Sequence, residues 1–538
     1  MKPIATDIYT FSELITNGYT YVDKTDRYLQ LIAGKIGKQF FLARPRRFGK
    51  SLTVSTLQAI FEGRRSLFTG LAIESAWDWT KTWPVLRLDM GSCQASSVEE
   101  FWDKLGDLLI SESDRLEIPL RGKSPSSQFR FFIEDLARRN RNEILVAAKA
   151  RGEPLPSDVQ GQMVLLVDEY DKPILGHLGK TDVGEIRDAL KEFYSVIKTC
   201  ESCQRFTFIT GVSKFSKVSI FSDLNNLVDL TMDARTATMF GYTHDEVKKY
   251  FGEHLAALGA ANGLAPDEAF DKVIAMYNGY CFHHAAERVV NPVSLGRCFC
   301  DCEFKSYWYE TGTPTFLVEL LKKRPIDISN LEILESQLGS YEPQAPQVVP
   351  LLFQTGYLTI KDFVSDDDGN RFYRLGFPNN EVEKAFSETL TMAYTGVDDI
   401  TFGRVQVEGR RALANHDLKK FFELLGILFA NLPYDLTDRQ NEQTWQAIFV
   451  VVLRFLGIKV IPESRTNRGR IDAVVEFAHE IYVIEVKLNK TAADALTQIK
   501  EKRYHEKYLA SGKRITLVGI NFSSESRTID DWKSEVVA

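Results

Sequence analysis

Short apolar runs alternate with helix-like stretches through the first half of the chain. The runs lie at residues 39–43, 85–88, 163–167 and 206–210. Apolar runs of this length are typical of strands that are buried on both sides in a parallel sheet. Residues 51–61 and 183–197 carry their apolar side chains at helical spacing. The alternation predicts an α/β domain over residues 1–245, with helices on both faces of a parallel sheet.

The pattern becomes mostly helical over residues 246–400. Helical patterns at about 315–323, 331–338 and 346–355 precede two β-rich runs at 357–363 and 371–375. The intervening turn reads Asp-Asp-Asp-Gly-Asn, and Asp-Gly chemistry favours a hairpin. Three helices followed by a hairpin predict a winged-helix-like segment. Such a segment binds DNA or serves as an ATPase lid, and the lack of a dense basic helix before the hairpin favours the lid.

Composition limits the class of protein. The 538 residues carry a formal net charge of −7, so the whole chain is not a polycation that coats nucleic acid. The apolar stretch 447–461 is interrupted by Arg454 and Lys459 and falls short of the roughly 20 residues of a membrane span. Seven irregularly spaced cysteines and an N-terminus without a secretory apolar region predict a cytoplasmic protein with free thiols. A zinc site in the cysteine clusters 200–203 or 298–302 is the alternative.

The sequence Arg-Pro-Arg-Arg-Phe-Gly-Lys-Ser at residues 44–51 joins a predicted strand to a predicted helix. Backbone N–H groups at a helix start bind phosphate, and the helix dipole favours the anion. Lys50 would reach the β- and γ-phosphates of ATP, and the Ser51 hydroxyl would ligate Mg²⁺. Arg44 stands where a general P-loop has glycine. The expected nucleotide contacts are Arg46, Arg47, Phe48, Gly49, Lys50 and Ser51, and the two arginines either neutralise phosphate or are solvated loop cations.

Two acids end the strand predicted at 163–167. Asp168 would hold the Mg²⁺ shell, and Glu169 would act as the general base for the attacking water. At the end of the next strand, Thr210 or Ser213 could contact the γ-phosphate. A phosphate loop, an acidic strand end and a polar strand end in this order favour nucleotide hydrolysis. The alternative is a buried strand with a solvated acidic end.

A second constellation lies in residues 469–487. If these residues fold as a hairpin that turns between residues 478 and 479, Asp472 lies opposite Glu485, and Lys487 shares their face. Opposed side chains are about 4.5–5.5 Å apart at Cβ, and two carboxylates this close repel unless a cation lies between them. Mg²⁺ or Mn²⁺ with oxygen ligands meets this need and predicts metal-dependent phosphodiester hydrolysis. The alternative is an amphipathic hairpin with a polar outer face.

The helix expected after the hairpin extends this site. Gln498 and Lys502 lie one turn apart on one face. With that lysine, the neighbouring cations Lys500, Arg503 and Lys507 predict a basic surface. Tyr504 and Tyr508 could stack on bases or pack in the core. Upstream, Glu442 could add a carboxylate to the metal site or be an ordinary acid at a helix start.

These motifs resemble a known bacterial arrangement. Residues 6–230 are similar to the AAA-ATPase-like family of P-loop ATPases, whose own phosphate loop has the form seen at residues 44–51 and whose motifs also match residues 168–171 and 211–216. Residues 420–525 resemble the PD-(D/E)XK nuclease superfamily: its signature matches Asp472, Glu485 and Lys487, and Gln498 matches the following-helix position. The resemblance implies a P-loop NTPase fold followed by an α/β restriction-endonuclease-like domain, which we assign to residues 401–538.

We therefore expect a protein that binds and hydrolyses ATP and uses a metal-dependent nuclease domain to cleave nucleic acid, with DNA as the favoured substrate and ATP state gating cleavage. The expected catalytic residues are Glu169, Asp472, Glu485, Lys487 and Gln498. Asp168 and Thr210 complete the expected cofactor contacts, and Ser51, Asp168, Asp472 and Glu485 are the expected metal ligands. The chain could form a homo-oligomer. The alternatives are a nucleotide-dependent switch or adaptor whose nuclease fold only binds nucleic acid or a partner, and a nucleic-acid motor.

Overall fold

The computed structural model covers the chain in two compact units. It describes all residues except 35, 153–158, 216–219, 222–225, 309–316, 319, 322–327, 329–330, 339–342, 344–346, 431–441, 457, 459, 467–468, 478, 527 and 538. Unit 1 comprises Met1–Tyr307 with Ile333–Tyr373, and unit 2 comprises Trp308–Glu332 with Arg374–Ala538. The division into residues 1–245, 246–400 and 401–538 stays a prediction.

Unit 1 contains a five-stranded parallel sheet in the order β2-β3-β4-β1-β5. Its strands are β1 (Gln39–Ala43), β2 (Val85–Asp89), β3 (Met163–Asp168), β4 (Gln204–Gly211) and β5 (Val228–Asp229). The first four confirm the strands predicted from the apolar runs. Because β4 lies between β1 and β3, the carboxyl end of β4 is flanked by the phosphate loop on one side and by the acidic residues on the other.

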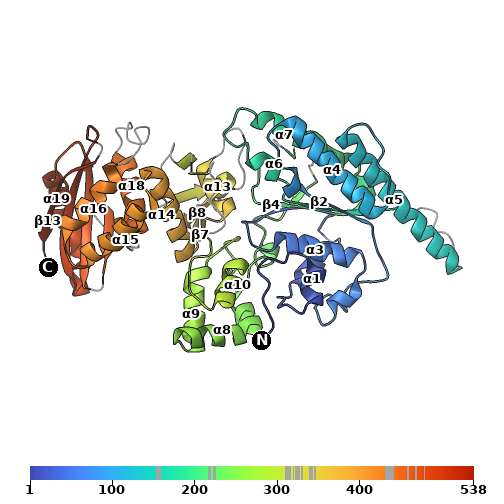
Figure 1. Cartoon of the computed structure of the whole chain (residues 1–538), viewed down its shortest axis with the longest axis horizontal. Helices are drawn as coiled ribbons and strands as arrows, with labels where there is room; N and C mark the ends of the chain where they lie inside the picture. Colours follow the sequence, from blue (N-terminus) through green and yellow to red (C-terminus); the bar gives the residue numbers. More distant parts are fainter. Residues whose placement is uncertain are drawn as a thin grey trace. The chain divides into compact units, whose positions relative to one another are not determined.

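Helices cover both faces of this sheet, as predicted (Figure 1). On one face lie α1 (Phe11–Thr16) and α3 (Lys50–Phe61), and on the other lie α4 (Val98–Leu116), α5 (Pro125–Ala150) and α7 (Val183–Thr199). Two shorter helices, α2 (Thr25–Ile32) and α6 (Lys172–Leu175), complete this part of the chain. The aromatic rings of Phe129 and Phe193 stack with centroids 4.4 Å apart and fix α5 against α7.

Three helices follow the sheet: α8 (His244–Asn262), α9 (Pro266–Tyr277) and α10 (Pro292–Asp301). A capping box of Thr243 and Glu246 starts α8. Glu246 also accepts a hydrogen bond from the Lys24 ammonium at 2.6 Å, and Val22 packs into the apolar core of the three helices. The segment before α2 is therefore bound to the helical region more than 200 residues further along the chain.

A winged-helix topology occupies the next part of the chain. The elements are β6 (Leu331–Leu334), α12 (Glu335–Leu338), α13 (Val348–Thr355), β7 (Thr359–Ser365) and β8 (Arg371–Gly376), and the sheet order is β6-β8-β7. The prediction of a helix over 331–338 is wrong in its first half, because β6 pairs with β8 and tertiary pairing overrides a weak local pattern. The last helix and the hairpin are confirmed. The helix predicted at 315–323 lies largely outside the described residues.

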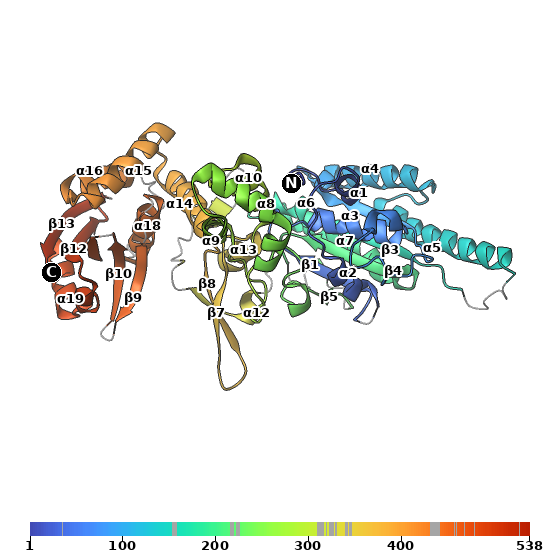
Figure 2. The same cartoon turned by 90° about the horizontal axis from the view of Figure 1, so that it is seen from below.

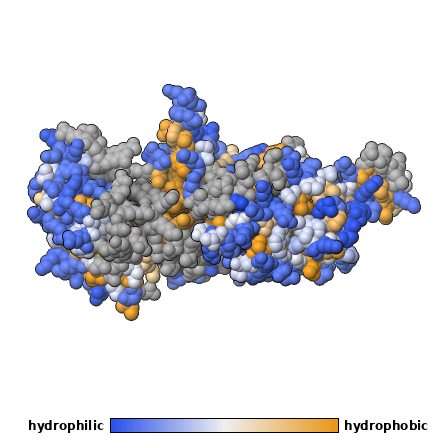
Figure 3. All heavy atoms as spheres, turned by 90° about the horizontal axis from the view of Figure 1, so that it is seen from above, coloured by the Kyte–Doolittle hydropathy of each residue, from blue (hydrophilic) through white to orange (hydrophobic). Residues whose placement is uncertain are grey.

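The β7–β8 hairpin projects from its sheet (Figure 2). The Asp366 carboxylate accepts backbone N–H bonds from Asp368 and Asn370, which closes the turn. The tip is hydrophilic, and hydrophobic side chains lie below it (Figure 3), among which Val364 and Phe372 are exposed. An acidic tip would repel a phosphate backbone, which supports the lid over the DNA-binding reading of this segment.

Unit 2 is built on a five-stranded mixed sheet in the order β13-β12-β11-β10-β9. Its strands are β9 (Val460–Thr466), β10 (Gly469–Glu476), β11 (Glu480–Leu488), β12 (Arg514–Ser523) and β13 (Thr528–Val536); β11 and β12 are parallel, and the other pairs are antiparallel. The helices are α14 (Asn380–Thr395), α15 (Asp399–Ala414), α16 (Leu418–Ala430), α18 (Glu442–Phe455) and α19 (Ala492–Glu501). The register of β10 on β11 pairs Ala473 with Ile484, as the hairpin prediction requires.

Both faces of the β10–β11 hairpin are covered. On the face of Val474 and Val483 lies an apolar cluster with Ile499 of α19. On the other side of the sheet, Phe522 packs against Trp445 of α18, with ring centroids 5.0 Å apart. An amphipathic hairpin with a polar outer face is therefore ruled out, and the charged residues of the hairpin lie in a largely buried setting.

Candidate active sites: a phosphate loop and a carboxylate hairpin

The phosphate loop of unit 1 runs from β1 into α3. Gly49 is the N-cap of α3 in the left-handed conformation, at φ 84°, which glycine adopts without steric cost. The Lys50 side chain is buried, and its ammonium donates to the carbonyls of Arg44 and Pro45 at 3.0 and 2.9 Å. Burial lowers the pKa of Lys50, and the charge of Asp168 opposes this shift. The loop thus holds a cation at the amino end of a helix, the arrangement that binds a phosphate.

The acidic strand end faces this loop across one strand. Asp168 is buried, and burial raises its pKa, while a hydrogen bond with the Ser51 hydroxyl and the charge of Lys50 lower it. Glu169, at φ 49°, is one of the few non-glycine residues in the left-handed region. The Glu169 carboxylate lies 3.7 Å from the Lys172 ammonium, and its charge also acts to raise the pKa of Lys50. The structure therefore brings Lys50, Ser51 and Asp168 together.

The side chain of Thr210, expected to contact the nucleotide, is engaged in a hydrogen bond within the sheet. Its hydroxyl donates to the Leu42 carbonyl at 2.9 Å, and its side chain is buried. This bond joins β4 to β1 below the strand ends. The polar backbone beyond Thr210 is held by Asp171, a buried acid to which the sequence reasoning gave no role. Its carboxylate accepts the N–H groups of Val212 at 3.2 Å and Ser213 at 2.6 Å.

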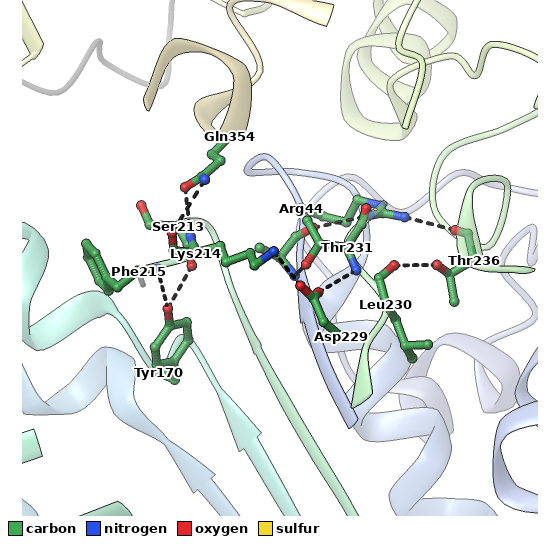
Figure 4. Close-up of polar contacts among 11 residues, drawn as sticks. Arg44, Tyr170, Ser213, Lys214, Phe215, Asp229, Leu230, Thr231, Thr236 and Gln354 are labelled. Atoms are coloured by element: carbon green, nitrogen blue, oxygen red, sulfur yellow. Dashed lines mark hydrogen bonds and ion pairs between the residues drawn. The ribbon is translucent and has the colours of Figure 1, made fainter. Parts of the chain in front are cut away.

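The segment that follows β4 is held from several sides (Figure 4). The Tyr170 hydroxyl donates to the Ser213 carbonyl at 2.9 Å. The Lys214 backbone N–H donates to the side-chain oxygen of Gln354, a buried residue of α13, at 2.7 Å. The Lys214 ammonium forms an ion pair with Asp229 at the end of β5. Helix α13, which belongs to unit 1, therefore contacts the residues directly beyond the polar end of β4.

Arg44 explains the departure from a general phosphate loop. The side chain is 1% exposed, and its guanidinium donates to the carbonyls of Thr231 at 2.6 Å and Thr236 at 3.0 Å. It also lies 4.2 Å from the ring centroid of Phe282. Burial lowers the pKa of Arg44 to about 9. Arg44 therefore fixes the start of the loop to the chain beyond β5, and its side chain points away from the cradle.

The three residues that follow Pro45 divide between two roles. Arg47 has φ 68°, and its guanidinium donates to the Tyr307 carbonyl at 3.2 Å. Phe48 is buried edge-on against the ring of Tyr280, with centroids 4.8 Å apart. Arg46 is half-buried and close enough to Lys50 that its charge lowers the pKa of that lysine. The contacts of Arg47 and Phe48 anchor the loop, and both residues also line the cavity beside it.

A cavity of about 110 Å³ lies beside the phosphate loop. Its walls include Leu52 of α3 and the aromatic rings of Tyr9, Tyr21 and Tyr242. Apolar and aromatic walls next to a phosphate cradle suit the flat, apolar base of a nucleotide. The sequence gave no sign of this cavity, because its walls come from the N-terminal segment, the loop and the α8–α10 region.

The carboxylate site of unit 2 forms where β10 and β11 separate. Asp472 accepts the Val486 backbone N–H at 2.7 Å and the Gln446 amide at 3.1 Å. Glu485 is 1% exposed; one carboxylate oxygen accepts the Lys487 ammonium at 3.2 Å and the Gln498 amide. The structure thus brings Asp472, Glu485, Lys487 and Gln498 together, as the sequence predicted. It adds Gln446 of α18, for which the sequence carried no signal.

The second oxygen of Glu485 is buried, and among the described residues it has no hydrogen-bond partner. Burial, followed by the charge of Asp472, raises the pKa of Glu485 to about 8. One buried and one partly buried carboxylate, with a bare oxygen on the buried one, fit a hard divalent cation with oxygen ligands. Three or more His, Cys, Asp or Glu side chains do not gather as a metal-ligand group anywhere in the described parts of the chain. A cation here would therefore rest on two carboxylates, with backbone or water oxygens completing its shell.

Lys487 lies between two acids. Its buried ammonium is 3.2 Å from Glu442 of α18 and 3.2 Å from Glu485. Burial works against its charge, yet the charges of Glu485 and Glu442 raise the pKa of Lys487. Glu442, which the sequence offered as a further metal ligand, is here a partner of this lysine.

The surface around α19 is less basic than predicted. Lys500 pairs with Glu535 at 2.5 Å, and Arg503 lies 3.4 Å from Glu506. Tyr504 is buried in the apolar cluster and is not available to stack on a base, whereas Tyr508 is partly buried against it. A hydrogen bond with Gln498 connects Tyr504 to the carboxylate site.

Two family models match the regions of the chain that contain these two sites. Residues 5–221 match the family described as predicted AAA-ATPase, and residues 440–532 match the PD-(D/E)XK nuclease superfamily. The chain is 36% identical over 540 residues to a protein of Azotobacter chroococcum mcd 1 named "Uncharacterized protein in vnfD 5'region", with 98% of each chain covered. No solved structure matches the chain. Within the described residues, every helix is too short or too polar to cross a membrane.

Proposed function

The chain belongs to the AAA-ATPase-like family and ends in a PD-(D/E)XK nuclease superfamily domain, and from this premise we propose that it hydrolyses ATP and cleaves nucleic acid, with DNA as the substrate. The proposal assigns hydrolysis of ATP to the phosphate loop of unit 1. It assigns cleavage of a phosphodiester to the carboxylate hairpin of unit 2. ATP state controls the rate of cleavage.

The observation that carries the nuclease assignment is the bare oxygen of Glu485 beside Asp472. A structural acid would be fully hydrogen-bonded, because a buried carboxylate oxygen without a partner is costly. Asp472 and Glu485 would hold a divalent cation, which when bound acidifies a water and balances the charge of the phosphodiester. Lys487 would hold its ammonium toward the phosphate or the attacking water, and Gln498 orients Glu485.

For ATP hydrolysis, the roles follow the positions of the side chains. Lys50 would exchange its two loop carbonyls for the β- and γ-phosphates, because a charged phosphate is the stronger acceptor. Ser51 and Asp168, which are hydrogen-bonded to each other, would hold Mg²⁺. Glu169 is the proposed base for the attacking water. The cavity of about 110 Å³ would take the base of the nucleotide.

ATP gating of cleavage draws its support from the Gln354–Lys214 contact. In this proposal the residues beyond β4 would lie next to the γ-phosphate, and Gln354 connects them to α13 of the winged-helix segment. A γ-phosphate that attracts the Lys214 ammonium would compete with Asp229 and shift the backbone that Gln354 holds. The winged-helix segment would then take different positions with ATP and with ADP.

A metal-dependent cleavage assay tests the nuclease assignment. Purified protein is incubated with plasmid and linear DNA in Mg²⁺ or Mn²⁺, beside the variants Asp472→Asn and Glu485→Gln. We expect cleavage by the wild type and a loss of about 10³-fold or more in both variants. Glu480→Gln is the matched control, because Glu480 is a buried glutamate of the same strand that binds Thr516 outside the site. Equal cleavage by the wild type and Glu485→Gln would refute the assignment. Nucleic-acid binding with no cleavage by any protein would favour the switch or adaptor.

A further inference from the structure

A groove of about 540 Å³ lies among the helices of unit 2, and the residues of the carboxylate site do not line it. Its wall carries Lys384 of α14 and Gln406, Arg410 and Arg411 of α15. Leu456, directly after α18, forms part of the apolar floor. Three cations and no acid line the groove, and neither the sequence motifs nor the proposed chemistry uses any of them.

Two of these cations differ from Lys500 and Lys513 of the nuclease domain, which are held by acids. Lys500 and Lys513 pair with Glu535 and Glu476 at 2.5 and 2.7 Å. Within the described residues, Arg410 and Arg411 form no ion pair, and both are exposed. Lys384 has only a distant partner, Glu388, at 3.8 Å. Cations gathered without acids in a concave wall create a positive potential that attracts an anion.

The position of the groove relates it to the carboxylate site through α18. Gln446, in the first half of α18, binds Asp472, and Leu456 follows the last residue of the same helix. Ten residues of helix span about 15 Å. Phosphates of one DNA strand follow each other by about 3.4 Å along the helix axis, so this distance corresponds to about four phosphates. A strand that runs along α18 from the carboxylates would therefore meet the groove within about four phosphates.

We propose that this groove binds the phosphodiester backbone of the nucleic-acid substrate, a few nucleotides from the bond that is cleaved. The inference rests on the proposed nuclease function and adds a second contact site to it. Arg410 and Arg411 would each hold a phosphate through their planar guanidinium groups, which match phosphate geometry with two parallel hydrogen bonds. Gln406 and Lys384 would contact the same strand. The groove thereby sets the position of the substrate and takes no part in the chemistry.

The test compares two charge reversals of equal size. Binding of a fluorescent 30-base-pair duplex is measured by anisotropy in EDTA, so that no cleavage occurs, for the full-length wild type, Arg410→Glu/Arg411→Glu and Lys419→Glu/Lys420→Glu. The second pair lies on α16 and does not line the groove. We expect Arg410→Glu/Arg411→Glu to weaken binding at least tenfold. The slope of log K against log salt concentration should become less steep by about 1.8, the value for two lost phosphate contacts. We expect the lysine pair to bind within about threefold of the wild type.

Arg410→Lys/Arg411→Lys should recover part of the affinity, which a merely misfolded groove would not allow. The proposal that the groove binds DNA would be overturned if Arg410→Glu/Arg411→Glu bound with wild-type affinity. It would also be overturned if both double variants lost affinity equally. If the duplex binds through the groove but no metal-dependent cleavage occurs, the DNA-binding role of the groove would hold and the proposed nuclease function would be refuted. A wild type that binds no duplex would overturn both.

Discussion

The two sites meet the same problem, buried charge, in opposite ways. In the phosphate loop the cation is already satisfied: Lys50 donates to two loop carbonyls, and Arg44 donates to the chain beyond β5. In the carboxylate hairpin, one oxygen of Glu485 has no partner in the described chain, and the pKa of that acid is raised to about 8. Backbone builds the first site, and side chains from several elements build the second.

The difference has an energetic consequence. A phosphate entering the loop exchanges one set of hydrogen bonds for another, so the fold of unit 1 does not depend on its ligand. A cation entering the hairpin relieves a repulsion that folding itself creates. Unit 1 should therefore depend for its stability on the structural anchor Arg44 and not on Lys50 or the ligand, and unit 2 should gain stability from its ligand.

The largest effect is expected at Arg44. Arg44→Ala leaves buried carbonyls, among them those of Thr231 and Thr236, without their charged donor and opens a cavity. We expect a loss of about 3–4 kcal/mol, seen as a fall of roughly 5 °C in the melting transition of unit 1. Arg46→Ala is the control and should melt within about 1 °C of the wild type. Equal melting of the two variants would contradict the role of Arg44 as an anchor.

Lys50→Ala should change ligand binding and leave the fold intact. Loss of a charged hydrogen-bond donor to phosphate costs about 1.5–3 kcal/mol, or roughly 10- to 100-fold in ATP affinity, which titration calorimetry measures. Lys180→Ala, at an exposed lysine of the same unit, is the control. If Lys50→Ala unfolds unit 1 instead, the loop depends on this cation, and the contrast between the two sites is wrong.

A divalent cation should stabilise unit 2. At ten times its Kd, a bound ion adds about 1.4 kcal/mol, a rise of roughly 3–6 °C in the melting of a unit of this size. Calorimetry in Mg²⁺, Mn²⁺ and EDTA measures it, and Glu485→Gln should remove the response. The same rise in that variant would place the ion elsewhere in the chain.

The smallest effect is expected at the link between the nucleotide site and the winged-helix segment. Gln354→Leu removes the hydrogen bond to Lys214 at nearly constant side-chain volume. It should reduce the coupling free energy between the nucleotide and the winged-helix segment by about 1 kcal/mol, which is roughly a fivefold change in the coupling constant. Hydrogen exchange of residues 348–376 with ATP and with ADP is the readout. Gln347→Leu, at the exposed N-cap of the same helix, is the control. A difference between ATP and ADP that persists unchanged in Gln354→Leu would show that this bond carries no coupling.

The local hydrophobic pattern was sufficient to predict the fold where tertiary pairing favours the same element as the pattern. The first four strands of unit 1 are short apolar runs. Their local pattern and their pairing in the sheet both favour a strand, so the two do not conflict. The register of β10 on β11 followed from the need to bury Ala473 and Val475 on one face. Residues 331–334 have a helical pattern but form strand β6, because they pair with β8 in the sheet.

The supporting residues of both sites could not be predicted, because they act across long stretches of sequence. Asp171 holds the backbone of Ser213, and Gln446 binds Asp472, at separations of 42 and 26 residues. Gln354 reaches Lys214 across 140 residues. A motif names the side chains that meet the ligand, whereas the partners that orient them depend on how distant elements pack.

The central claim is that ATP state sets the rate of nucleic-acid cleavage, and a single comparison tests it most directly. The initial rate of DNA cleavage in Mg²⁺ is measured with ATP, with ADP and with a non-hydrolysable ATP analogue, for the wild type and for Lys50→Ala. The account predicts that the wild-type rates with ATP and ADP differ at least about fivefold, and that Lys50→Ala cleaves at one rate with all three. Cleavage that depends on Glu485 but proceeds at the same rate with every nucleotide would contradict it.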